Sequence, residues 1–107
     1  MTYDRWIGVD LDGTLAHYEG WKGGDHIGEP ISLMMDRVKD WLSHGMKVKI
    51  FTARVCEPEN IPYIEQWLAE HGLGGLEITN VKDFGMIELW DDRSYRVIAN
   101  TGERCCI

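Results

Sequence analysis

Long apolar runs and basic residues are both scarce in this 107-residue sequence. No apolar stretch approaches the ~20 residues that cross a bilayer, and the first residues lack a signal-peptide pattern, so we expect no membrane partner. Eleven lysines and arginines stand against 18 aspartates and glutamates, which gives a formal net charge of −7. General affinity for a nucleic-acid backbone depends on neutralising phosphates, so this deficit argues against it. A small basic pocket is compatible with the same composition.

Cysteine is also rare, and its three copies do not suggest a disulfide framework. Cys56 stands alone, and Cys105 and Cys106 are adjacent. An odd count with an adjacent pair is a poor pattern for disulfides, and reduced thiols in a cytoplasmic protein are the simpler interpretation. Repeats, linkers and low-complexity tracts are absent from the sequence. Together with a length near the mode for one domain, this predicts a single domain over residues 1–107.

The most informative stretch is residues 6–15, Trp-Ile-Gly-Val-Asp-Leu-Asp-Gly-Thr-Leu. An apolar, β-favouring start closed by a glycine turn predicts a buried strand over residues 6–10. Asp10 and Asp12 follow at its carboxyl end, where ligands bind in open α/β sheets. Two carboxylates in one small volume repel each other unless a cation or a shared proton relieves them. Two solvated aspartates in a turn are the commoner alternative, and the rest of the chain decides between the two.

The remaining chain alternates between helical and extended patterns. Helical spacing runs from Pro30 to Gly45 and again from Pro62 to Gly72, with a loop expected at 55–60. Residues 16–29 hold four glycines and predict a flexible flap above the carboxylates. Extended segments are expected at 48–51, 76–81, 87–90 and, as a fifth strand, 95–99. The alternation predicts an α/β protein with a mostly parallel central sheet.

One connection conflicts with a parallel sheet. Parallel neighbours need a crossover of about a dozen residues. The five residues of 82–86 reach only ~17 Å when extended. Part of residues 76–81 is therefore expected to be crossing chain instead of strand.

Polar side chains stand at or near the expected carboxyl ends of the strands. They are Asp10, Asp12, Thr52, Lys82, Asp91 and Asp92. Carboxylates that converge with a hydroxyl and an ammonium suit a hard divalent cation together with a phosphate. Mg²⁺ prefers carboxylate, phosphate and water oxygens, and the hydroxyl and ammonium would hold the phosphate oxygens that face away from the metal.

In this order the residues resemble the phosphohydrolases of the haloacid dehalogenase superfamily. Asp10-Leu11-Asp12-Gly13-Thr14 matches the first family motif in full, and Lys-Ile-Phe-Thr at 49–52 matches the second. Lys82 stands for the third motif and Trp90-Asp91-Asp92 for the fourth. The resemblance covers residues 6–92 and implies a three-layer, Rossmann-like fold. Neither 16–29 nor 55–60 is long enough for an inserted cap domain, so the chain resembles the small capless type.

The resemblance implies a Mg²⁺-dependent phosphomonoester hydrolase that acts through an aspartyl-phosphate. Asp10 would be the nucleophile, and Asp12 the general acid and later the base. The metal ligands implied are Asp10, Asp91, the backbone carbonyl of Asp12, and Asp92, the last through water or by orienting Lys82. The phosphate ligands implied are Thr52 and Lys82, with help from the amides of Gly13 and Thr14.

Three further side chains are candidates for substrate contact. Arg54 and Arg93 follow their motifs closely enough to reach a substrate phosphate, although a solvent-facing or ion-paired arginine is an equal alternative for Arg54. Trp21, in the glycine-rich flap, is a candidate for stacking on a base. A capless site suits a phosphate on something large, such as a nucleotide or nucleic-acid end, or a cap supplied by another subunit in a homo-oligomer.

Three rival functions share some of these residues. A phosphoacceptor domain of the receiver type also uses acidic residues, Thr and Lys, but its acceptor aspartate ends a later strand. A dehalogenase of the same superfamily would need neither an acid at Asp12 nor a metal site. An inactive phosphate-binding domain would not need the intact residue set.

Overall fold

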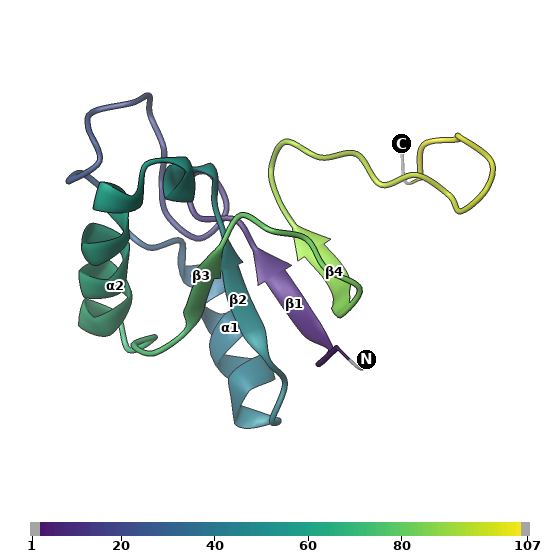
Figure 1. Cartoon of the computed structure of the whole chain (residues 1–107), viewed down its shortest axis with the longest axis horizontal. Coiled ribbons are helices and arrows are strands. Elements are labelled where there is room, and N and C mark those ends of the chain that lie inside the picture. Colours follow the sequence, from purple (N-terminus) through teal and green to yellow (C-terminus); the bar gives the residue numbers. More distant parts are fainter. Residues whose placement is uncertain (1–2, 106–107) are drawn as a thin grey trace.

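Residues 3–105 of the computed structural model form a four-stranded, all-parallel sheet with two α-helices (Figure 1). The order along the chain is β1 (Trp6–Val9), α1 (Ser32–Ser43), β2 (Val48–Phe51), two 3₁₀ turns η1 (Ala53–Cys56) and η2 (Pro58–Asn60), α2 (Ile61–Glu70), β3 (Glu77–Thr79) and β4 (Met86–Trp90). The strand order in the sheet is β3-β2-β1-β4. The predicted α/β class and parallel sheet are confirmed, and the expected 55–60 loop lies mostly in the 3₁₀ turns.

Both helices cover the same face of the sheet. The crossovers β1-α1-β2 and β2-α2-β3 step in one direction along the sheet. Because such crossovers are right-handed, they place their helices on one side. The core on that side contains Ile7 and Val9 of β1, Val48 and Ile50 of β2, Met34, Met35 and Val38 of α1, and Ile64, Trp67 and Leu68 of α2. The expected three-layer arrangement is not confirmed, because within residues 3–105 no helix covers the opposite face.

The segment from β3 to β4 crosses that opposite face (Figure 1). It takes residues 80–85, so the last two residues of the expected 76–81 segment are crossing chain. Six extended residues reach ~20 Å. The three strand spacings amount to about 14 Å and the return along a strand to about 13 Å, so the diagonal path of roughly 19 Å is just within that reach. Asp83 accepts a 2.8 Å hydrogen bond from the indole N–H of buried Trp6 and lies 3.7 Å from the ammonium of Lys49. The crossing segment, held by these polar contacts, lies where a second layer of helices would otherwise pack on the sheet.

Residues 91–105 leave the sheet after β4 as an irregular segment (Figure 1). The expected strand at 95–99 is not formed, and Val97 makes only an isolated antiparallel bridge with Arg104. Cys56 is an exposed thiol, and Cys106 lies outside the described residues. Neither helix within residues 3–105 has the length and apolar character needed to cross a bilayer.

Candidate active site

The carboxyl ends of the strands open into a cleft of about 760 Å³. Parallel strands end at one edge of a sheet, so the residues that follow them meet there. The cleft is lined by Asp10, Asp12, Tyr18, Trp21, Phe51, Thr52, Ala53, Arg54, Cys56, Glu57, Asn60, Asn80, Asp91, Asp92 and Arg93. Most of the side chains singled out in the sequence are therefore neighbours in space.

Three carboxylates converge on one side of this cleft. Asp10, Asp91 and Asp92 each place one oxygen so that all three oxygens lie within 4.8 Å of one another. The neighbouring strands β1 and β4 bring them together, because Val9 pairs with Trp90 and the amide of Asp10 donates to the Trp90 carbonyl at 2.9 Å. Oxygens of this kind are ligands for hard divalent cations.

The acidic neighbours make Asp10 a poor place for a negative charge in the absence of a cation. Burial raises the pKa of Asp10 from its usual 3.8 to about 7. A hydrogen bond with Asp92 and the charges of Asp91 and Asp92 add to the rise, and a hydrogen bond from the Leu11 amide opposes it. A bound cation would relieve the same repulsion.

We expect Asp10→Asn to stabilise the metal-free protein, increasingly so as the pH rises from about 4 to about 7. Over this window the native state holds a proton on Asp10 that the unfolded chain has lost. The free energy of unfolding of the wild type therefore falls with rising pH, and the neutral amide removes that loss. Urea unfolding in excess chelator below, within and above the window measures the effect. A difference that is independent of pH, or one matched by Asp36→Asn on the exposed side of α1, contradicts it.

Hydrogen bonds within the loop after Asp10, and between this loop and Asp92, hold the loop in place. The Thr14 hydroxyl lies 3.2 Å from a carboxylate oxygen of Asp92 and accepts a 3.0 Å hydrogen bond from the Asp92 amide. Gly13 has a φ of 89°, and a Cβ there would clash with the Asp92 carboxylate, so glycine is required. The amides of Gly13 and Thr14 donate to the carbonyls of Ala16 and Leu11. Their expected contact with substrate stays a prediction.

Arg54 is the buried centre of a polar network that joins Asp12 to the flap, residues 16–29. Its Nε donates to Asp12 Oδ2 at 2.7 Å and its Nη2 to Asp12 Oδ1 at 2.9 Å. The same guanidinium donates to the carbonyls of Gly24 and His26 at 3.1 and 2.9 Å. The structure thus has the ion-paired form of Arg54 that the sequence left open. Contact with a substrate phosphate would require some of these bonds to open, and that role stays a prediction.

Asp12 lies outside the three-carboxylate group, because both of its carboxylate oxygens face Arg54. Its side chain is therefore placed for a role other than metal binding. The expected contact of its backbone carbonyl with a metal stays a prediction.

The two expected phosphate ligands occupy different places. Thr52 is 2% exposed, lines the cleft, and accepts a 3.2 Å hydrogen bond from the Arg54 amide. Lys82 is exposed on the crossing segment and is not among the residues that line the cleft. The physical reason is that this segment leaves the carboxyl edge after β3 and runs to the start of β1, where the Trp6 amide donates to the Gly85 carbonyl. The phosphate contact of Lys82 stays a prediction.

One polar residue of the site had no signal in the sequence. Asn60 is 5% exposed, and its side-chain amide donates to the Arg54 carbonyl at 3.1 Å. It also lies so close to Gly24 of the flap that a Cβ on Gly24 would clash with it. A single asparagine between a loop and a helix carries no motif, so only its buried contacts identify it.

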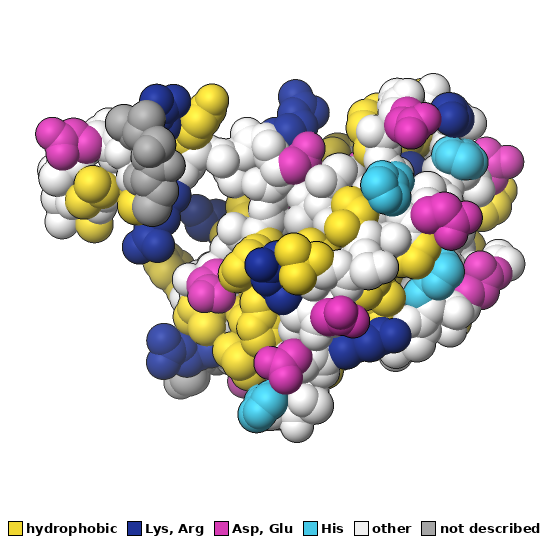
Figure 2. Space-filling view, turned by 180° about the vertical axis from the view of Figure 1, so that it is seen from behind, with side chains coloured by type: hydrophobic (Ala, Val, Ile, Leu, Met, Phe, Trp, Pro, Cys, Tyr) yellow, Lys and Arg dark blue, Asp and Glu magenta, His cyan; other side chains and the backbone are white. Residues whose placement is uncertain are grey.

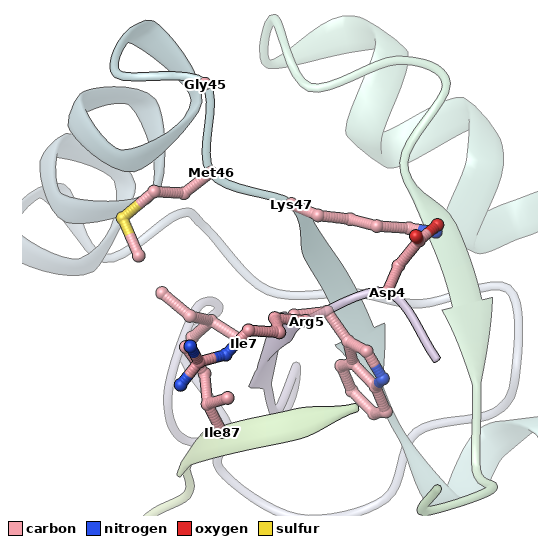
Figure 3. A pocket seen from close by; sticks show the side chains of 8 residues that line it. Asp4, Arg5, Ile7, Gly45, Met46, Lys47 and Ile87 are labelled. Atoms are coloured by element: carbon pink, nitrogen blue, oxygen red, sulfur yellow. The ribbon is translucent and has the colours of Figure 1, made fainter. Parts of the chain in front are cut away.

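A second hollow, of about 670 Å³, lies at the opposite, amino end of the strands (Figure 3). The side chains of Met46 and Ile87 border it, and Lys47 points to Asp4, with 3.6 Å between the charged atoms. One exposed ion pair, the side chain of Arg5 and apolar side chains offer less chemistry than the converging carboxylates at the other edge.

Comparisons with protein-family models, with curated proteins and with solved structures found no match for this chain. Its function is therefore inferred from the residues of the cleft and their geometry.

Proposed function

We propose that this protein is a Mg²⁺-dependent phosphomonoester hydrolase of the haloacid dehalogenase type. The observation that supports this best is the convergence of Asp10, Asp91 and Asp92 in a cleft that also contains Asp12 and Thr52. The order of these residues along the chain is the one that resembles the family. A second helix layer belongs to the fold that the resemblance implies, and the crossing segment would replace it here.

The proposed reaction has two steps, both at Asp10. In the first, a carboxylate oxygen of Asp10 attacks the phosphorus, and the bond between phosphorus and the ester oxygen breaks. The ester oxygen keeps the electron pair, takes a proton from Asp12 and leaves as an alcohol. In the second step, water attacks the phosphorus and gives a proton to Asp12. The bond to Asp10 then breaks, which leaves inorganic phosphate and a free carboxylate.

The donor set fits a hard divalent cation, because it offers three carboxylate oxygens and no sulfur or imidazole. Mg²⁺ held by Asp10, Asp91 and Asp92 would offset the negative charge of the carboxylates and of the phosphate group. Thr52 would donate its hydroxyl proton to a phosphate oxygen. Lys82 would donate from its ammonium group only if its exposed side chain reached the cleft, which it does not line in this structure.

Both carboxylate oxygens of Asp12 accept hydrogen bonds from Arg54. This contact favours one alternative function, a phosphoacceptor domain. If Asp12 stayed bound to Arg54, the aspartyl-phosphate at Asp10 would lack a base for its hydrolysis and would persist.

Phosphate release from p-nitrophenyl phosphate is expected to require Mg²⁺ and to stop in excess chelator. Mg²⁺ should also raise the melting temperature, because it binds the folded state, and at a hundred times its Kd the gain is about 2.7 kcal/mol. Asp91→Asn should weaken both effects, and Asp36→Asn should weaken neither. Stable phosphoprotein without turnover would indicate the phosphoacceptor alternative. Full turnover in chelator with no thermal shift would contradict the metal site.

A further inference from the structure

Trp21 of the flap lines the cleft with 56% of its surface exposed. The guanidinium carbon of Arg54 lies over its ring, 4.8 Å from the ring centre. Because one face of the indole is covered in this way, the solvent-exposed surface includes the opposite face. Tyr18, 48% exposed, comes from the same flap and lines the same cleft. Exposed aromatic surface in a cleft is available for a ligand.

The support under the indole is rigid. Arg54 is 7% exposed and is held by its bonds to Asp12, Gly24 and His26. A guanidinium fixed in this way gives the indole a cationic partner that stays in place on one face of the ring.

Trp67 is a useful comparison for Trp21, because its contact with the flap is purely structural. Trp67 of α2 is 7% exposed, and its indole N–H donates to the Gly28 carbonyl at 3.0 Å. It anchors the flap to the core and belongs to the main hydrophobic cluster. Trp21 is outside that cluster, and its exposed ring adds little to the core.

The indole is also close to the proposed chemistry. The 2.7 Å bond between Asp12 and Arg54 Nε, and the 4.8 Å from the guanidinium to the ring, place the indole centre within roughly 9 Å of an Asp12 carboxylate oxygen. This is the scale on which a sugar ring separates a phosphate from its base. A phosphate ester whose leaving oxygen lies near Asp12 and a base on Trp21 are thus compatible with one ligand.

We infer that Trp21 forms a base-stacking subsite, which makes nucleotides the substrate class of the proposed phosphatase. This inference rests on the proposed function for the place of the phosphate, but the stacking itself does not require turnover. Stacking on an aromatic ring accepts any base, because every base has a π-face. The cleft volume of about 760 Å³ is within the range of small-molecule sites.

The surface charge indicates that the protein would contact only a single nucleotide or the terminal nucleotide of a longer nucleic acid. The chain carries a net charge of −7, and on the face seen from behind acidic and basic side chains are interspersed (Figure 2). A longer phosphodiester backbone needs a run of positive charge to be held. The ligand is therefore a free nucleotide or the phosphorylated end of an oligonucleotide.

The test compares adenosine 5′-monophosphate with ribose 5-phosphate, which has an anomeric hydroxyl in place of the base. Binding is measured by calorimetry on the Asp10→Asn protein with Mg²⁺, so that no ligand is consumed. The nucleotide is expected to bind at least about tenfold more tightly. Adding Trp21→Ala should remove most of that preference, Trp21→Phe should keep it, and Tyr63→Ala, an exposed aromatic on α2 outside the cleft, should not change it.

Equal affinity for the two ligands, or a preference that survives Trp21→Ala, overturns the subsite. A 5′-phosphorylated oligonucleotide serves as the third ligand. A Trp21-dependent gain for it supports recognition of nucleic-acid ends, and a gain for the mononucleotide alone supports free nucleotides. If the wild type binds nucleotides through Trp21 and hydrolyses none, the phosphatase proposal fails and the subsite stands.

Discussion

Asp10→Asn is expected to lower phosphate release by about 10⁴-fold or more while the protein stays folded. The amide keeps the shape of the side chain but lacks the negative oxygen that would attack phosphorus. Phosphoprotein trapped by rapid denaturation should disappear with the activity. Because metal-free Asp10 stands in a repulsive cluster with Asp91 and Asp92, the substitution should not destabilise the fold at neutral pH.

Asp91→Asn separates the nucleophile from a metal ligand. The loss in this variant should be partly recovered at high Mg²⁺, because one ligand of three is weakened. The loss in Asp10→Asn should persist at any Mg²⁺ concentration. Asp36→Asn makes the same chemical change on an exposed part of α1 and should keep wild-type turnover. Near wild-type turnover in a purified Asp10→Asn protein would place the nucleophile elsewhere.

Asp12→Asn is expected to slow the hydrolysis of an alkyl phosphate ~10²–10⁴-fold, and to slow the first step with p-nitrophenyl phosphate much less. An alkoxide is a poor leaving group unless it is protonated in the transition state, whereas p-nitrophenolate is stable as an anion. With the aryl ester, the aspartyl-phosphate should form in a burst and then persist, because its hydrolysis still needs a base. Stopped-flow detection of nitrophenolate and trapping of the phosphoprotein measure both steps.

The ion pair of Asp12 with Arg54 requires a control in that experiment. Removing one partner of a fully buried pair typically costs about 3–5 kcal/mol of stability. The Asp12 side chain is 20% exposed, so Asp12→Asn should cost less than this and still lower the melting temperature. Arg54→Gln removes the same pair but keeps the Asp12 carboxyl group. Its ratio of alkyl to aryl turnover should therefore stay close to that of the wild type. An equal loss on both substrates in Asp12→Asn, without accumulated phosphoprotein, would limit Asp12 to a structural role.

The sequence alone determined the parts of this protein that depend on local pattern. Apolar runs closed by polar residues identify β1, β2 and β4, and helical spacing identifies α1 and α2. Parallel strands share a carboxyl edge by geometry, so the meeting of Asp10 with Asp91 and Asp92 follows once the strands are known. The length of the connection also indicated that crossing chain begins before Lys82. These inferences need only the spacing of apolar residues along the sequence and the distance that an extended chain of known length can span.

Only the tertiary structure decided how the remaining polar groups are paired. Arg54 binds Asp12 across 42 positions of sequence, and the pairing depends on how the flap folds over the end of β2. Lys82 is absent from the cleft lining because Asp83 fixes the crossing segment to Trp6 on the far face of the sheet. Neither contact leaves a local pattern, because the partners are 42 and 77 positions apart in the sequence. The burial of each pair, which sets its strength, exists only in the folded chain.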